Sequence, residues 1–97
     1  MTRSEAIVRL RAHEAELKLL GIDSLYLFGS TARDEATAES DVDLFFDHPP
    51  GSLGIYQLMD LKEAANRILG GRADIMSRRS LHPRLKAAIE QRAVRVF

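Results

Sequence analysis

The chain reads LYLFGSTAR over residues 25–33 and DVDLFFD over residues 41–47. The first segment begins with an apolar run that is typical of a buried strand, and this run ends at Gly29 and Ser30. Residues 31–40 are small and polar, and we expect one or two helical turns there, capped by Ser30 or the next residue. A strand that ends at a glycine and leads into a helical turn can bring backbone amides close to a phosphate group.

The second segment alternates between polar and apolar residues. In a strand, residues two positions apart lie on the same face of the sheet. Asp41, Asp43 and Asp47 should therefore share one face with Phe45, whereas the other face carries only apolar side chains. This pattern predicts a strand over residues 41–47 that packs one face against helices and presents carboxylates on the other.

The rest of the chain is expected to surround these segments with helices and short strands. Apolar periodicity and the Gly and Pro positions predict helices over residues 3–20, 53–69 and 83–91, and strands over residues 22–28, 72–76 and 93–97. Within the helix over residues 53–69, we expect Ile55 and Met59 to face the core. The last helix should begin at Pro83 and turn Leu85 inward. His13 falls on the apolar stripe of the first helix, where a single hydrogen bond is a commoner role than catalysis.

Composition places the chain among compact globular domains. Its 97 residues are 45% hydrophobic and 29% charged, which predicts a single domain over residues 1–97 rather than a two-domain enzyme. The absence of cysteine excludes a disulfide scaffold, a thiol nucleophile and a thiolate zinc site, and it fits a cytoplasmic protein. The longest apolar stretch is four residues. A bilayer crossing needs about 20, so we expect no membrane span and no signal peptide.

Charge is distributed unevenly, although the formal net charge is zero. Residues 34–47 contain six acids and no base, whereas residues 72–97 contain seven bases and two acids. A basic segment can contact phosphate or an acidic protein, but charged side chains are most often solvated surface. The segment lacks interleaved aromatic residues before Phe97, so we do not expect nucleic acid as a partner.

The residues with chemical potential form one pattern. Gly29 and Ser30 precede Asp41 and Asp43 by a spacer of ten residues, and Asp74 lies in the next predicted strand. The glycine lets a phosphate approach the backbone, and the serine adds a hydroxyl donor. Two aspartates at i and i+2 of a strand have Cα atoms about 6.6 Å apart on one face, which suits a pair of hard cations such as Mg²⁺. Such ion pairs bracket the attacking and leaving oxygens in phosphoryl and nucleotidyl transfer.

The same residues also allow a plainer interpretation, in which a capped turn precedes an edge strand whose acidic side chains face solvent. This interpretation accounts for each half of the pattern separately. It gives no reason for Asp41 and Asp43 to lie beside further aspartates without a basic neighbour in the strand. We therefore favour a metal-dependent transfer site.

The segments GSTAR (residues 29–33) and DVDL (residues 41–44), with their ten-residue spacer, resemble the GSx10DxD signature of polymerase-β-type nucleotidyltransferases. They are most similar to the minimal nucleotidyltransferase (MNT) antitoxins of HEPN/MNT toxin–antitoxin pairs. The resemblance covers nearly the whole chain, although Ala73 stands where a larger β-branched residue is usual. It implies an α/β (α+β) class and the minimal nucleotidyltransferase fold, a small mixed β-sheet with helices packed mainly on one face.

The resemblance also implies a reaction: transfer of AMP from ATP, with Mg²⁺, to a hydroxyl of a cognate HEPN toxin. Such toxins are RNases that are silenced by modification of a tyrosine. By position, Asp41 and Asp43 would bind two metal ions, and Asp74 would complete one metal site and accept the proton of the attacking hydroxyl. Gly29 and Ser30 would hold the β- and γ-phosphates of ATP.

Arg33 is open to two interpretations. Its guanidinium group matches the geometry of a phosphate, but an exposed pairing with Asp34 or Glu35 fits the sequence equally well.

Three functions remain open on the sequence alone. A protein adenylyltransferase antitoxin needs a partner that brings its own hydroxyl, and it predicts a hetero-oligomer. The short chain favours this function, because larger members of the superfamily use an additional domain to hold the acceptor. The alternatives are an antitoxin that silences a toxin by binding alone, and a nucleotidyltransferase that acts on a small molecule.

Overall fold

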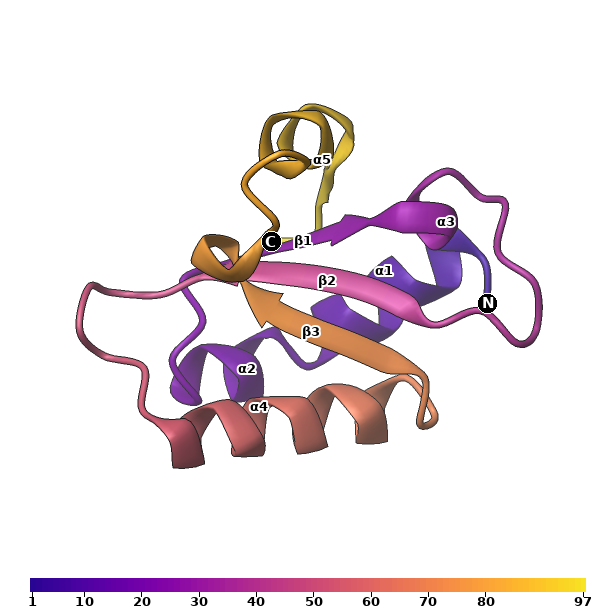
Figure 1. Ribbon diagram of the computed structural model, residues 1–97. Coiled ribbons are helices and arrows are strands. Elements are labelled where there is room, and N and C mark those ends of the chain that lie inside the picture. The colour runs from indigo at the N-terminus through magenta and orange to yellow at the C-terminus, as the bar shows by residue number, and fades with distance from the viewer.

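The computed structural model describes residues 1–97 as a four-stranded sheet with helices on both sides (Figure 1). The strands are β1 (Ser24–Phe28), β2 (Val42–Asp47), β3 (Ala73–Ser77) and β4 (Val94–Arg95). The helices are α1 (Arg3–Ala12), α2 (Glu14–Leu19), α3 (Gly29–Ala32), α4 (Ile55–Ile68) and α5 (Lys86–Arg92), and a 3₁₀ turn, η1 (Arg78–Ser80), follows β3. None of the helices combines the length and the apolar composition that a bilayer crossing requires.

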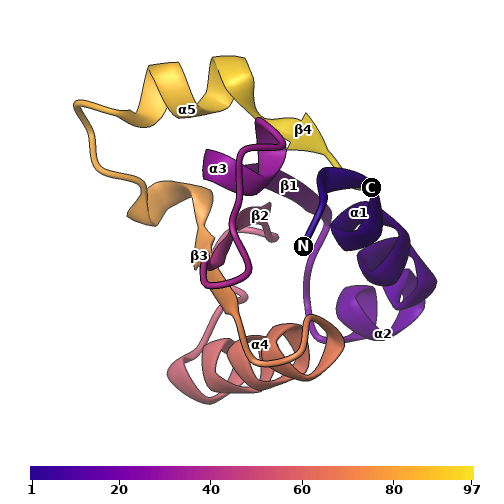
Figure 2. The same cartoon turned by 90° about the vertical axis from the view of Figure 1, so that its right-hand side faces the viewer.

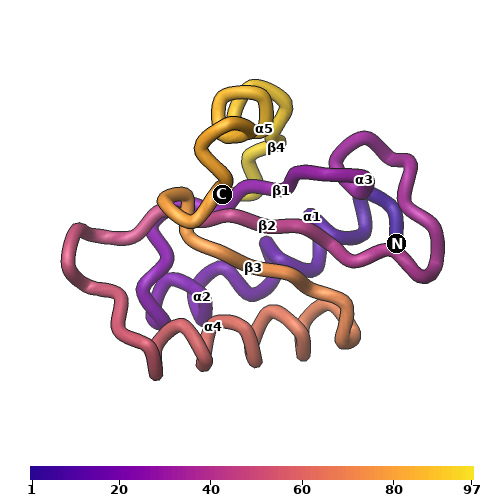
Figure 3. The backbone as a smooth tube through the Cα atoms, viewed as in Figure 1, coloured from indigo at the N-terminus to yellow at the C-terminus, as the bar shows by residue number.

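The sheet is mixed, with the strand order β3-β2-β1-β4. Strand β1 is antiparallel to both β2 and β4, whereas β2 and β3 are parallel. Parallel neighbours need a crossover connection, and α4 provides it. The backbone trace shows the C-terminal segment leaving the end of β3 and passing above the sheet before it returns as β4 (Figure 3). The mixed sheet of the predicted fold is confirmed.

The hydrophobic core lies between the sheet and one layer of helices. Helices α1, α2 and α4 cover one face of the sheet, and α5 lies on the other side (Figures 1 and 2). The alternation predicted for β2 is confirmed, because Val42, Leu44 and Phe46 all belong to this core. They pack with buried residues of the covering helices: Ala6, Leu10, Leu17, Leu61, Ala65 and Ile68.

The predicted helix over residues 3–20 is interrupted at His13, which separates α1 from α2. The His13 amide bonds to the Leu10 carbonyl at 3.1 Å, three residues back, and its Nδ1 donates to the Arg9 carbonyl at 2.8 Å. The side chain thus occupies a carbonyl that the next helical turn would otherwise use. The single hydrogen bond expected for His13 is confirmed.

Several predicted details of burial are wrong. Ile55 and Met59 are 72% and 58% exposed, because α4 turns the side that carries Leu61 toward the sheet. Leu85 is 55% exposed, and no residue of α5 is buried. Strand β1 is buried at alternate residues rather than on both faces.

Two predicted helix starts are also wrong. Helix α5 begins at Lys86 rather than at Pro83. Helix α3 begins at Gly29, before the expected caps, because the chain turns as soon as β1 ends.

Candidate active site

The glycine turn and the aspartates meet at one edge of the sheet. The strand register pairs Asp43 with Asp74 across β2 and β3, and with Phe28 across β1 and β2. Phe28 is the last residue of β1, and Gly29 follows it directly. Because β1 is antiparallel to β2, its end lies beside the beginnings of β2 and β3. The predicted proximity of these residues is therefore a consequence of the register.

Gly29 packs against the carboxylate of Asp43. Its φ is +75°, in the left-handed region that favours glycine. A Cβ atom at this position would overlap the Asp43 carboxylate. Glycine is therefore required both by the backbone conformation and by the close approach of the turn to the acid.

The charges at this edge act on one another. Burial raises the pKa of the Asp43 carboxyl above its ordinary value, and the negative charges of Asp74 and Asp41 raise this pKa further. The positive charge of Arg33 lowers it. Asp43 is half-buried, whereas Asp41 and Asp74 are exposed. The structure thus places Asp74 and Asp41 close enough to Asp43 to repel its negative charge, with Arg33 as the counter-charge.

The donors at this edge suit a hard divalent cation. As they stand, the side chains do not form a group of three ligands around one point. Asp41 and Asp74 are exposed, however, so their side chains can rotate toward Asp43 at little cost. Carboxylate oxygens are the ligands that Mg²⁺ prefers in proteins, and a divalent cation would offset the repulsion that raises the pKa of Asp43.

Ser30 and Arg33 lie on α3 and at its C-terminal cap. The half-buried Ser30 accepts a backbone hydrogen bond from Glu35 at 2.9 Å through its carbonyl. The Nε of Arg33 donates to the Glu35 carboxylate at 3.1 Å, and both side chains are exposed. The surface pairing considered for Arg33 is therefore present, and its charge acts on Asp43 at the same time.

The C-terminal segment brings one basic residue next to the site, and the sequence pattern does not single it out. Arg92 of α5 lies with Phe28, Gly29 and Arg33 around a cavity of about 170 Å³. The only sequence signal is the excess of bases in residues 72–97, which does not indicate which arginine faces the glycine turn.

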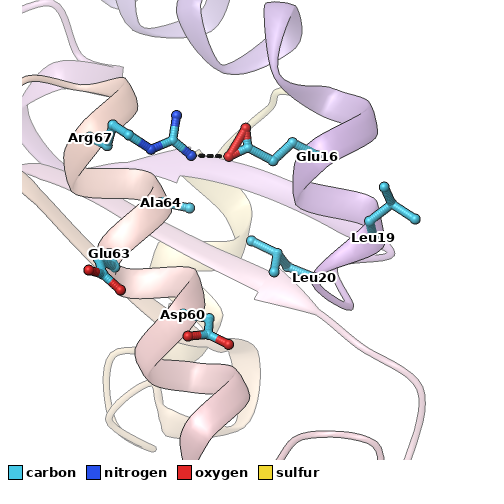
Figure 4. A pocket seen from close by; sticks show the side chains of 7 residues that line it. All are labelled: Glu16, Leu19, Leu20, Asp60, Glu63, Ala64 and Arg67. Carbon is cyan, nitrogen blue, oxygen red and sulfur yellow. Dashed lines mark hydrogen bonds and ion pairs between the residues drawn. The ribbon is translucent and has the colours of Figure 1, made fainter.

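A larger hollow of about 640 Å³ lies elsewhere, between α2 and α4 (Figure 4). Leu20 and Asp60 are among the residues that line it, and an ion pair between Arg67 and Glu16 joins the two helices there. Neither the glycine turn nor the aspartates of β2 and β3 reach it. We assign the chemistry to the end of the sheet where Gly29 packs against Asp43, because the aspartates of β2 and β3 lie there.

Comparison with known proteins adds the family to this geometry. Residues 10–96 match the family model described as the nucleotidyltransferase domain. The chain belongs to the nucleotidyltransferase family. The match includes the glycine turn and all three aspartates of the candidate site, and it confirms that the chain is a nucleotidyltransferase.

Relatives and solved structures agree with this identification. The nucleotidyltransferase is 36% identical over 93 residues to a candidate protein adenylyltransferase of Methanocaldococcus jannaschii (MJ1379), with 93% of each chain covered. It is 34% identical over 84 residues to protein adenylyltransferase MntA of Thermococcus cleftensis, which covers 84% of this chain and 82% of MntA.

Two solved structures share its fold. A candidate minimal nucleotidyltransferase has a TM-score of 0.82 at 33% identity, with 97% of this chain and 95% of that chain covered. A toxin–antitoxin crystal structure with AMP-PNP has a TM-score of 0.69 at 18% identity, with 100% of this chain and 73% of that chain covered. The minimal nucleotidyltransferase fold expected from the sequence is confirmed.

Proposed function

We propose that this nucleotidyltransferase transfers AMP from ATP to a hydroxyl group of a partner protein and acts as the antitoxin of a toxin–antitoxin pair. The observation that carries the proposal is the register that sets Asp43 beside Asp74, with the Gly29 turn packed against the same carboxylate. The names of the MJ1379 and MntA relatives support a protein as the acceptor.

Each residue of the site has a proposed role. Asp41 and Asp43 would each bind two Mg²⁺ ions, and Asp74 would bind one of them. Gly29 and Ser30 would hold the β- and γ-phosphates, and Arg33 would add a positive charge beside them. When bound, Mg²⁺ supplies positive charge to the phosphate oxygens.

The reaction exchanges a phosphoanhydride bond of ATP for a phosphoester bond to the acceptor. The acceptor oxygen attacks the α-phosphorus of ATP and forms a new P–O bond. The bond between the α-phosphorus and the α,β-bridging oxygen breaks, and pyrophosphate leaves with the electron pair. The proton of the acceptor hydroxyl passes to the carboxylate of Asp74, which lies at the exposed edge of β3 where an acceptor can approach.

The acceptor surface is proposed to come from the partner. Every helix and strand of residues 1–97 belongs to the nucleotidyltransferase fold, and none forms a separate unit that could hold an acceptor. We propose a HEPN toxin as the partner and a tyrosine as the acceptor residue. A tyrosine hydroxyl gives up its proton with a pKa of about 10, more easily than an aliphatic hydroxyl. This function requires a hetero-oligomer and fits the ATP-containing cytoplasm.

The test uses this protein together with the protein encoded beside its gene. The partner is incubated with the nucleotidyltransferase, ATP and Mg²⁺, and its intact mass is measured. We expect an increase by one or more adenylates, which Asp41→Ala and Asp43→Ala should abolish. Asp60→Ala is the matched control, because Asp60 lies on α4 away from the site and should leave the transfer unchanged.

The alternatives give different results in the same experiment. Stoichiometric inhibition of the purified toxin without ATP, unaffected by the aspartate changes, would select an antitoxin that acts by binding alone. Turnover on a free hydroxyl compound without a partner would select a small-molecule transferase. Transfer that survives both aspartate changes would refute the assignment of the metal ligands.

A further inference from the structure

Helix α5 lies over the sheet without burying any of its own residues. Figure 2 shows it above α3, on the side of the sheet opposite α4. Its apolar residues Ala88 and Ile89, together with the preceding Leu85, line the cavity of about 170 Å³ described above. An amphipathic helix normally packs its apolar side against a core. Here that side faces a space that begins at the Gly29 turn.

The position of α5 over this space is fixed by Arg78. The Arg78 guanidinium donates to the Asp47 carboxylate of β2 at 2.7 and 2.9 Å and to Glu90 of α5 at 2.5 Å. It also lies 4.9 Å from the ring centroids of Tyr26 and Phe45, on the face of the sheet below α5. One arginine therefore connects α5 to two strands, and the space under the helix is a built feature of the fold.

The charges around the cavity are all positive. Arg33 and Arg92 line it, and no acidic residue does. Arg33 is paired with Glu35, whereas Arg92 makes no hydrogen bond or ion pair in the structure. The remaining walls are Gly29 and apolar side chains. Apolar walls strengthen charge interactions, and two guanidinium groups match the oxygens of a phosphate chain.

We propose that Arg92 of α5 is an additional phosphate ligand, which reaches across this cavity to the β- and γ-phosphates that Gly29 and Ser30 are proposed to hold. The inference rests on the proposed function, because it assumes that the α-phosphate lies at Asp41 and Asp43. From there a phosphate chain that runs past Gly29 enters the cavity between Arg33 and Arg92. Arg92 then also stabilises the negative charge that develops on pyrophosphate as it leaves.

The same cavity could instead receive the acceptor segment of the partner, and binding measurements on this chain alone separate the two cases. Calorimetric titrations of wild-type protein with ATP, inorganic pyrophosphate and AMP, each with Mg²⁺, are compared with those of Arg92→Ala. We expect Arg92→Ala to weaken ATP and pyrophosphate about tenfold or more, which is the usual effect of one charge-assisted hydrogen bond, and to leave AMP unchanged. Arg92→Lys should fall between the two, because it keeps the charge and loses the planar fork.

The matched control is Arg95→Ala, which removes one positive charge from β4 in the same segment. Equal weakening by Arg92→Ala and Arg95→Ala would overturn the proposal in favour of a general charge effect. Unchanged ATP binding with a raised KM for the partner protein would assign the cavity to the acceptor and overturn it as well. Failure of the wild-type protein to bind ATP at all would refute the proposed function and this inference with it.

Discussion

Asp43 and Asp74 occupy paired positions on the parallel strands β2 and β3. The backbone register, rather than any attraction between the side chains, sets these two acids next to each other. Asp43 is half-buried and close to a third acid, Asp41, so its charge is poorly solvated and is repelled from two sides. A site of this kind lowers its energy when it takes up a proton or a cation.

Replacing Asp43 with asparagine should raise the melting temperature in metal-free buffer and abolish AMP transfer. The pKa of Asp43 is raised in the folded protein above the ordinary 3.8. Stability is therefore lost as the pH rises from about this value through the raised pKa, and the ionised carboxylate opposes folding at pH 7. The asparagine side chain carries no charge that Asp41 and Asp74 could repel. Thermal unfolding with EDTA should show the gain at pH 7 and a smaller gain near pH 4. A lower melting temperature than wild type at pH 7 would contradict this account of the site.

ATP with Mg²⁺ should stabilise the wild-type protein. At a hundredfold excess over Kd, ligand binding adds about 2.7 kcal/mol to the free energy of unfolding. For a chain of this length, this corresponds to a rise of about 10 °C or more in the melting temperature. Asp41→Asn and Asp74→Asn should lose most of the rise, whereas Asp60→Asn should keep it. An equal rise with ATP in EDTA would argue against a metal ion at the aspartates.

The sequence predicts those parts of the site that depend on local geometry. The period of a strand is enough to place Asp41 and Asp43 on one face of β2 and Val42 and Leu44 on the other. The sequence also predicts the turn at Gly29, directly after β1. Few residues other than glycine tolerate the positive φ and the close approach to an acid that the structure shows there. Family resemblance then supplies the fold.

The sequence does not predict contacts that depend on distant parts of the chain. Leu85 and Ile89 have the spacing of core residues, yet α5 is held by the contacts of Arg78 with Asp47 and Glu90, which no periodicity reveals. The apolar residues of α4 likewise extend around more of the helix than the sheet covers, so Ile55 is left exposed. Arg92 cannot be distinguished from the other bases of its segment until α5 is placed.

Gly29→Ala should damage the site more than it damages the fold. Gly29 and Gly70 share a φ of +75°, so alanine at either position should cost about 1–2 kcal/mol through backbone strain. A Cβ at Gly70 meets no atom within 4 Å, whereas a Cβ at Gly29 overlaps the Asp43 carboxylate. Gly70→Ala is therefore the matched control. Thermal unfolding should show a larger loss of stability for Gly29→Ala than for Gly70→Ala. The transfer assay should show a loss of AMP transfer only for Gly29→Ala. Equal effects of the two changes on transfer would mean that the contact with Asp43 is unimportant.

Thr31→Val should stabilise the protein. Thr31 is 1% exposed, and its Oγ1 has no hydrogen-bond partner. Valine has the same shape without the unsatisfied hydroxyl, so we expect a gain of about 1 kcal/mol, or about 4–8 °C in melting temperature. Thr31→Ser keeps the hydroxyl and removes a buried methyl group, and it should lose about 1 kcal/mol. A loss of stability in the valine variant would show that the hydroxyl has a partner in solution.

Arg78→Ala should release α5 from the sheet. The guanidinium is 28% exposed and its partners Asp47 and Glu90 about a third exposed (35% and 32%), so we expect a loss near the lower end for charged hydrogen bonds, about 1.5 kcal/mol. The local effect should be larger than the global one, because α5 buries no residue that could hold it in place. Hydrogen exchange should therefore become faster at the Ile89 amide, which bonds to the Leu85 carbonyl at 2.9 Å, while the β2 amides stay protected. Arg79→Ala is the matched control, because this exposed neighbour makes no ion pair. Unchanged exchange in α5 after Arg78→Ala would mean that β4 pairing alone positions the helix.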